Sequence, residues 1–188
     1  RPWCELILYR QMPYSLMGNW HGISMLFPME RLFERYVAAA LRRALKRDAR
    51  LVTQAASRYL CEHGGSPMFR LEPDLLVEHG GRRWVLDTKW KRLDASDKAS
   101  KYGLSQADFY QIFAYGNKYL SGRGEMVLIY PQCKHFDQAL PVFDFGEDLH
   151  LWVLPFDLDD GCLVDSALTS LPLRNADLAN ARDEVLAA

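Results

Sequence analysis

The sequence predicts an α/β fold in which a mixed β-sheet is flanked by helices. Three observations lead to this prediction. The elements follow one another as helix, β-hairpin, helix, strand and strand, which is typical of one sheet with helical connections. The chain has 188 residues, of which 49% are hydrophobic, enough for one sizeable core. No apolar run is long enough to cross a membrane, and no signal peptide is visible.

The charge and the cysteines narrow the class of protein. The net charge is −1, so any surface that binds DNA must be local. The four cysteines lie far apart and form no CxxC pair, which argues against a zinc site or a disulfide framework and fits a cytoplasmic protein. They are Cys4, Cys61, Cys133 and Cys162.

The first helix begins near residue 28. The chain starts with Arg1 rather than Met, and we expect residues 1–27 to be the remnant of an upstream region and 28–188 to form the domain. Pro28 suits the first position of a helix that extends to about Arg47. Apolar residues recur in this helix at helical spacing: Met29, Leu32, Phe33, Tyr36, Val37, Ala40, Leu41, Ala44 and Leu45.

The opposite face of this helix is basic. It could contact phosphates, although an ordinary solvated face explains it more simply. Its members are Arg31, Arg35, Arg42 and Lys46. After the helix, residues 51–54 could be briefly extended, and residues 55–62 read as a short helix or loop.

A hairpin over residues 70–89 organises the rest of the chain. Two β-rich runs flank Gly80-Gly81, which is the signature of a two-residue turn. Counting outwards from the turn, His79 faces Arg82 and Leu75 faces Leu86. One face is apolar and predicts contact with the core: Leu75, Val77, Trp84 and Leu86.

The same register places Asp74 opposite Asp87. Opposed carboxylates repel each other, so a cation between them is the simplest reason for such a pair. Lys89 lies two residues after Asp87 and therefore on the same face. Two acids and a lysine predict a divalent metal site beside a positive charge. The alternative is a solvated hairpin face with unrelated charges.

Glu34 is a candidate third acid. On a helical wheel it falls within the flank of the first helix's apolar face, where a carboxylate is costly without a donor or a cation. It could bind the metal directly or through water. It could equally be an acid that reaches solvent from the edge of that face.

The second helix is predicted from Ser105 to near Gly122. Ser105 and Asp108 have a spacing like that of a capping box. Gln111 and Tyr115 share one helical face, and a buried Gln111 would need hydrogen-bond partners, either at a metal site or from the backbone. Apolar residues supply the packing: Phe109, Ile112, Phe113, Gly116 and Leu120.

The remaining segments are simpler. Residues 90–103 are polar and lysine-rich and read as a mobile loop, whose Lys91, Lys98 and Lys101 could meet DNA or serve solubility alone. Residues 126–130 and 149–156 are apolar strands, separated by a loop or irregular hairpin over 132–148. Residues 175–187 could form a last, peripheral helix.

Four segments in this order resemble the nuclease domain of the McrC family, the cleavage subunits of McrBC type IV restriction systems. They are FERYV, PD, LDTKWK and SQADFYQIFAY, within residues 28–131. Pro73-Asp74 followed by Asp87-Thr88-Lys89 resembles the PD-(D/E)xK signature of restriction-type nucleases. Gln111 and Tyr115 resemble the QxxxY motif of RecB-like and Cas4-like nucleases.

The resemblance implies a restriction-endonuclease-like core, with 28–188 as a PD-(D/E)xK nuclease domain. It implies that Asp74 and Asp87 ligate Mg²⁺, helped by the backbone carbonyl of Thr88, and that Glu34 completes the acidic cluster. Mg²⁺ would lower the pKa of a water molecule and neutralise charge in the transition state.

The same resemblance assigns roles to three further residues. Lys89 would position or polarise the attacking water, and Gln111 and Tyr115 would support the site or the DNA strand. The family's partner is an McrB-like AAA+ GTPase, engaged by an N-terminal region of which little precedes Pro28. We find no Walker A motif, so we expect the partner to bind GTP and to recognise modified DNA.

The sequence therefore predicts a magnesium-dependent DNA endonuclease subunit of a methylcytosine-dependent restriction system. One alternative is a RecB-like or Cas4-like nuclease of repair or CRISPR adaptation, against which the scattered cysteines argue. Another is a catalytically silent assembly module that docks a motor. The intact Asp74, Asp87 and Lys89 argue against that alternative.

Overall fold

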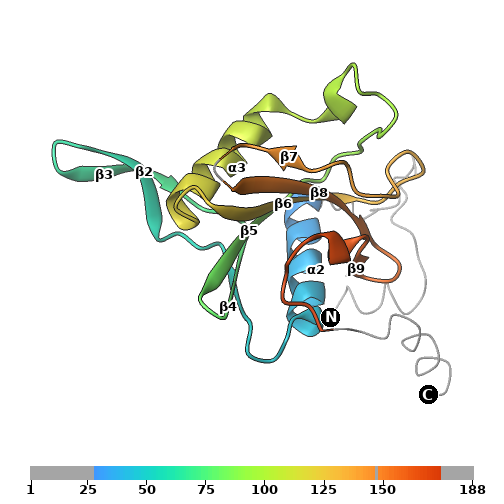
Figure 1. Cartoon of the computed structure of the whole chain (residues 1–188), viewed down its shortest axis with the longest axis horizontal. Helices are drawn as coiled ribbons and strands as arrows, with labels where there is room; N and C mark the ends of the chain where they lie inside the picture. Colours follow the sequence, from blue (N-terminus) through green and yellow to red (C-terminus); the bar gives the residue numbers. More distant parts are fainter. Residues whose placement is uncertain (1–27, 147, 175–188) are drawn as a thin grey trace, which may run out of the picture.

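The computed structural model describes residues 28–146 and 148–174 (Figure 1). Its main sheet has seven strands in the order β1-β4-β5-β6-β8-β7, and β9 pairs with β8 outside this path. The strands are β1 (Arg50–Thr53), β4 (Leu75–His79), β5 (Arg82–Thr88), β6 (Gly124–Pro131), β7 (Phe143–Asp144), β8 (Leu149–Asp157) and β9 (Cys162–Leu163).

The sheet is mixed, as the sequence predicts. Strands β1, β4 and β5 pair antiparallel, whereas β5, β6 and β8 pair parallel. Helix α3 (Gln106–Tyr119) makes the crossover between β5 and β6 that a parallel pair requires. Strand β7 pairs antiparallel with β8. For the segment before β8 we expected either a loop or an irregular hairpin, and this pairing makes it an irregular hairpin.

The predicted register of the central hairpin is confirmed. Leu75 faces Leu86 and His79 faces Arg82. Gly80 and Gly81 have φ of +56° and +77°, the backbone that a type I′ turn requires at both central positions. The turn chemistry therefore fixes which residues of β4 and β5 meet.

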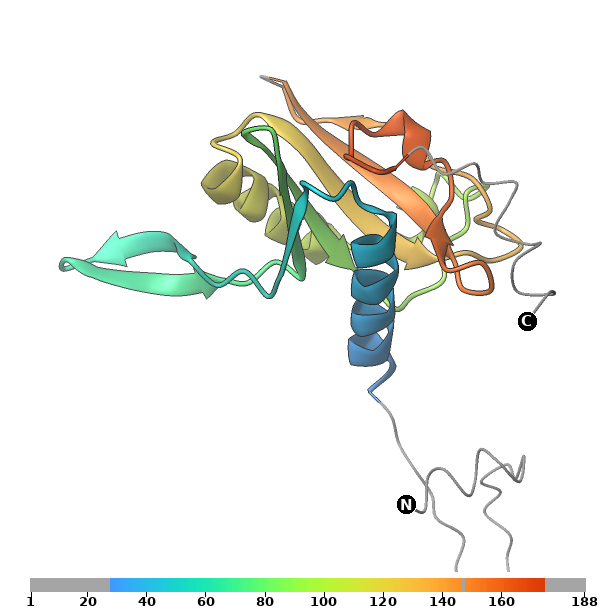
Figure 2. The same cartoon turned by 90° about the horizontal axis from the view of Figure 1, so that it is seen from below.

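Helices cover both faces of the sheet (Figures 1 and 2). Helix α2 (Met29–Ala44) packs on Trp84 and Leu86 of β5, and α3 packs on the side of Val85. Since side chains alternate along a strand, Asp87 shares the α3 face with Val85. Two apolar cores therefore hold β5 between them, and its C-terminal end lies where the acids are.

Residues 55–57 are a loop, but residues 58–62 form a strand in place of the short helix or loop that we predicted over 55–62. Strand β2 (Arg58–His63) pairs with β3 (Ser66–Leu71) as a second hairpin, which we call the arm. It projects from the body (Figure 2), and every residue of its strands except Leu71 is exposed. Because neither face is buried, the strands lack the alternation that indicates a half-buried strand. The Gly64-Gly65 pair was the available signal.

Tyr119 of α3 fixes the base of the arm. Its hydroxyl donates to the Leu71 carbonyl oxygen at 2.9 Å and accepts from the Ser57 N–H at 3.2 Å. It also contacts the Ala55 carbonyl oxygen. Both chain segments that enter the arm are thus held at one buried side chain.

Other predictions need correction. The first helix ends at Ala44, because Lys46 N–H instead donates to the Pro172 carbonyl at 2.9 Å. Leu32 is 49% exposed and Phe113 41%, so neither belongs to the buried face on which we placed it. Cys61 is exposed, and the three cysteines within the described ranges are all free.

Two predictions lie outside the described residues: the upstream remnant over 1–27 and the last helix over 175–187. Within the described part of the chain, no helix is long and apolar enough to cross a membrane.

Gly116 sets how closely α3 approaches the sheet. A Cβ there would overlap Met126 Sδ and lie 3.3 Å from Leu149 Cδ1. We expect Gly116→Ala to lower the free energy of unfolding by about 1–3 kcal/mol despite alanine's higher helix propensity, measured by urea denaturation. Lys118→Ala, on the exposed side of the same helix, is the control. Equal stability of the two variants would contradict this account of the packing.

Candidate active site

The two aspartates meet where the central hairpin ends. Asp87 is near the end of β5 and only 2% exposed, and Asp74 directly precedes β4. Asp74 Oδ2 accepts hydrogen bonds from Thr88 N–H at 2.8 Å and Thr88 Oγ1 at 2.6 Å. The Asp74 carboxylate is therefore held in place by the residue that follows Asp87.

Lys89 joins this pair from the same face. Its ammonium contacts the Asp87 carboxylate and donates to Gln111 Oε1 at 3.1 Å. It also lies 3.9 Å from Asp108 Oδ1. The predicted lysine therefore stands between a strand carboxylate and two polar residues of α3.

A chain of hydrogen bonds continues from Lys89 along α3. Gln111 Nε2 donates to the Tyr115 hydroxyl at 2.7 Å, and that hydroxyl donates to the Glu72 carbonyl at 3.1 Å. Gln111 is exposed and not buried. Its amide group nevertheless bonds to two side chains, those of Lys89 and Tyr115, and not to the backbone. The chain links the lysine to the backbone two residues before Asp74.

Glu34 is placed differently from the other predicted residues. It comes from α2, which covers the opposite face of the sheet, and its Oε1 accepts from Gln54 Nε2 at 3.3 Å. Among residues 28–146 and 148–174, no three His, Cys, Asp or Glu side chains are grouped so as to hold a metal ion. The structure therefore brings Glu34 toward Asp74 without gathering all three acids into one cluster.

Burial and mutual repulsion perturb the acids. Burial, followed by the charge of Asp74, raises the pKa of Asp87 to about 7, although Lys89 opposes this shift. Burial and Asp74 likewise raise the pKa of Glu34. Burial alone would lower the Lys89 pKa, but the neighbouring carboxylates, Asp87 first, raise it above its usual value. The shifted acids indicate a surplus of negative charge at this site.

The donor atoms fit a hard divalent cation such as Mg²⁺. Among residues 28–146 and 148–174, the site offers carboxylate oxygens of Asp74 and Asp87 and no sulfur or imidazole ligand, which is the chemistry that Mg²⁺ prefers. Asp87 Oδ2 is buried against the Lys89 ammonium without a well-directed hydrogen bond. A cation would satisfy this oxygen and offset the repulsion between the two aspartates.

Sequence reasoning missed two residues of the site. Asp108 was read as a helix cap, yet no side-chain cap bond is made at Ser105, and Asp108 faces Lys89 instead. Its position three residues before Gln111 on α3 was a usable signal. Gln54 holds Glu34 and also donates its N–H to the Asp74 carbonyl at 2.8 Å. No sequence pattern pointed to it.

The α/β architecture, with a mixed sheet between helices and acids at the end of its central hairpin, is a restriction-endonuclease-like fold. A family model described as McrBC 5-methylcytosine restriction system component matches residues 1–131. The chain belongs to this family and is a component of the McrBC restriction system, which confirms the resemblance seen in the sequence. Comparison with curated proteins finds no match.

One similar solved structure is a chain in the half-complex from a tetradecameric assembly of Thermococcus gammatolerans McrB AAA+ hexamers with bound McrC. The TM-score is 0.53 at 19% identity, over 69% of this chain and 28% of that one. This chain therefore spans under a third of the length of the protein it matches, and the likeness supports the fold.

Asp87→Asn should stabilise the metal-free protein. A carboxyl whose pKa is raised on folding contributes stability below its unfolded pKa, and that contribution is lost as pH rises through the folded value. With a shift from 3.8 to about 7, wild type should lose stability relative to Asn between about pH 4 and 7. We expect a gain of roughly 1–4 kcal/mol at pH 8 in EDTA by urea denaturation. A variant less stable than wild type at pH 8 would contradict the repulsion.

Gln54 adopts a left-handed backbone, with φ of +49°. Gln54→Val and Gln54→Gly both remove the bond to Glu34, but only valine is strained at positive φ. We expect Gln54→Val to be less stable than Gln54→Gly by about 1–2 kcal/mol, measured by thermal unfolding. Equal stability would show that the turn relaxes without cost.

Proposed function

We propose that this chain is the magnesium-dependent DNA endonuclease subunit of a methylcytosine-dependent restriction system. The observation that carries the proposal is a pair of neighbouring carboxylates, since the charge of Asp74 acts on the buried Asp87, with the Lys89 ammonium in contact with Asp87. A structural role gives no reason to bury one aspartate against another. A site that binds a cation and a phosphodiester gives one.

We assign the following roles to the residues of the site. Asp74 and Asp87, with the Thr88 carbonyl, would hold Mg²⁺, and Glu34 would reach it through water. When bound, Mg²⁺ activates a water molecule and neutralises charge developing on the phosphate. The placement of Lys89 suits a role in orienting that water and stabilising the same developing charge.

The α3 residues support the lysine. Gln111 accepts from Lys89 and donates to Tyr115, whose hydroxyl donates to the Glu72 carbonyl. This series of hydrogen bonds holds the Lys89 ammonium at a fixed distance from the two aspartates. Hydrolysis by an activated water needs no covalent intermediate, so no serine or cysteine nucleophile is required.

The partner belongs to the proposal as well. The similar solved structure contains McrB AAA+ hexamers with bound McrC, and the family match supports a comparable motor here. We propose an McrB-like GTPase as the partner of this protein, and we assign GTP hydrolysis and recognition of modified DNA to that partner.

A catalytically silent assembly module is the competing function. Two observations favour it: no three acids are preassembled within the described ranges, and Lys89 contacts one oxygen of Asp87. Magnesium titration therefore decides between the two functions.

The decisive experiment combines calorimetric titration with Mg²⁺ and a plasmid-nicking assay. We expect Asp74→Asn and Asp87→Asn to lose both binding and nicking. Lys89→Gln should keep Mg²⁺ binding and lose nicking by roughly 10²–10³-fold, the cost of removing one electrostatic stabiliser. Glu78→Gln removes a carboxylate from the same hairpin at the other end of β4 and should change neither.

Each result has a distinct meaning. Absence of Mg²⁺ binding by the wild type, with DNA present, would refute the nuclease function. Binding without nicking would be resolved by adding an McrB-like partner and GTP, and continued inactivity would then favour the assembly module.

A further inference from the structure

A hollow of about 600 Å³ opens on the outer side of α3, away from the acids. Rings form much of its surface: Phe109 meets Phe143 edge-on at 5.1 Å, and Phe113 stacks on Phe145 at 5.4 Å. Tyr110 stands at its margin and is 65% exposed. The hollow therefore offers flat aromatic surface to solvent.

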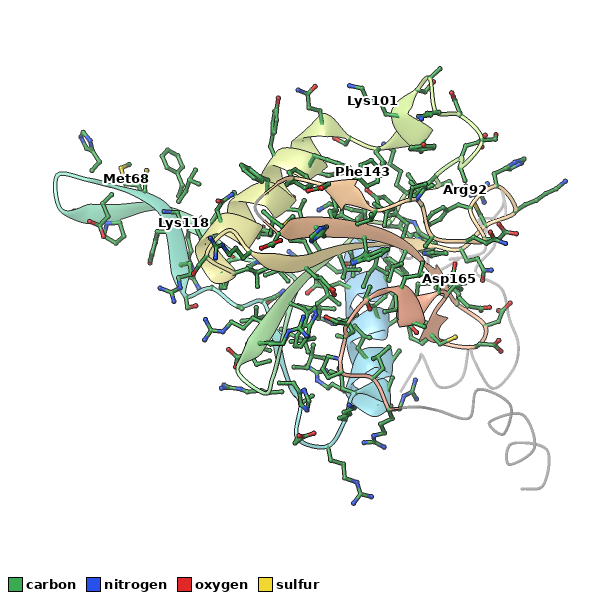
Figure 3. All side chains as sticks on the ribbon, in the orientation of Figure 1. Met68, Arg92, Lys101, Lys118, Phe143 and Asp165 are labelled. Carbon is green, nitrogen blue, oxygen red and sulfur yellow. The ribbon has the colours of Figure 1, made fainter. Side chains whose placement is uncertain are left out.

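The charged residues that line the hollow are positive. The only charged side chains among its lining residues are Lys98 and Lys101. Figure 3 shows Lys101 and Phe143 on the side where α3 begins. The protein as a whole has a net charge of −1, so two lysines without an acid among the residues that line the aromatic hollow favour an anionic ligand with flat apolar groups.

The segment that carries these lysines has an internal structure. Tyr102 N–H donates to the Asp97 carbonyl at 2.7 Å, and Asp94 N–H donates to the Tyr102 carbonyl at 3.1 Å. Lys101 begins a 3₁₀ turn (η1, Lys101–Gly103). We predicted a mobile loop here, and the segment is a loop whose backbone bonds give it a defined path, with Lys98 and Lys101 among the lining residues. Such a path lowers the ordering cost of binding.

We propose that this hollow binds an unpaired stretch of DNA, with bases stacked on Tyr110 and Phe113 and phosphates at Lys98 and Lys101. Stacking on aromatic side chains within a positively charged groove is how proteins hold single strands without reading sequence. The hollow lies in the size range of pockets that enclose small ligands, so it accommodates a base together with its sugar and phosphate. This inference rests on the proposed nuclease function, which supplies DNA as the polymer.

The helix connects the hollow to the acids. Gln111 and Tyr115 turn toward Lys89, whereas Phe109 and Phe113 turn toward the hollow, and an α-helix is about 10 Å across. Phosphates along one strand of duplex DNA are spaced by about 3.4 Å, so a strand that leaves the acids over the first turns of α3 would reach the hollow within a few nucleotides. The hollow would therefore hold an unpaired end or a frayed strand next to the point of cleavage.

The test is fluorescence anisotropy with a labelled single-stranded oligothymidylate, using the full chain in EDTA. We expect Tyr110→Ala to weaken binding by about ten-fold, which is within the range found for removing one stacking partner. Phe69→Ala, at an equally exposed aromatic residue of the arm, is the matched control and should bind as wild type does.

The lysines have a test of their own. For single strands the logarithm of affinity falls with the logarithm of salt concentration, with a slope near 0.7 per neutralised phosphate. The double variant Lys98→Gln/Lys101→Gln should therefore reduce the slope by about 1.4. Lys118→Gln/Lys134→Gln, at two exposed lysines outside the hollow, should leave it unchanged.

The outcomes separate this inference from the proposed function. If the wild type does not bind the oligonucleotide, or if Tyr110→Ala binds like Phe69→Ala, the inference is wrong, and an aromatic peptide from a protein partner becomes the better occupant. Magnesium-dependent nicking by the same variants tests the acids independently. Nicking without a stacking effect would leave the nuclease function standing, and a stacking effect without nicking would leave only the DNA site.

Discussion

The repulsion between Asp74 and Asp87 is the constraint around which the rest of the structure is arranged. Strand β5 is paired on both edges and covered on both faces, so Asp87 cannot turn away into solvent. Thr88 donates twice to Asp74, and Lys89 lies against Asp87. These contacts hold two like charges together without removing the surplus, so a bound cation, as we propose, would offset the repulsion that remains.

Much of this arrangement could be predicted from the sequence, because it depends on local rules. The Gly80-Gly81 turn fixes the register, the alternation of strand residues places Lys89 with Asp87, and helical spacing aligns Gln111 with Tyr115. Glu34 and Gln54 could not be related to each other in this way, since their contact depends on how α2 meets the end of the sheet. The arm was missed because a hairpin exposed on both faces carries no hydrophobic period.

The two sides of helix α3 contact different parts of the protein. One side supplies the hydrogen bonds that steady Lys89, and the other lies against rings of the β7 segment and the lysine-bearing turn. A substitution on either side is therefore expected to alter its own surface with little effect on the other, provided that Ile112 and Gly116 keep the helix seated on the sheet. Under the functions that we propose, this separation would let one short helix contribute both to the chemistry and to holding DNA.

Tyr119, which fixes the base of the arm, also lies between two parts of the structure that we expect to unfold separately. The arm is a two-stranded sheet without a core of its own, and such a sheet has little independent stability. We therefore expect its amide hydrogens to exchange with solvent through opening of the arm alone, and those of β5 and β6 to exchange only when the main sheet opens. Tyr119 marks the boundary between these two units. A change in the shape of the arm would therefore leave the spacing of the acids unaltered.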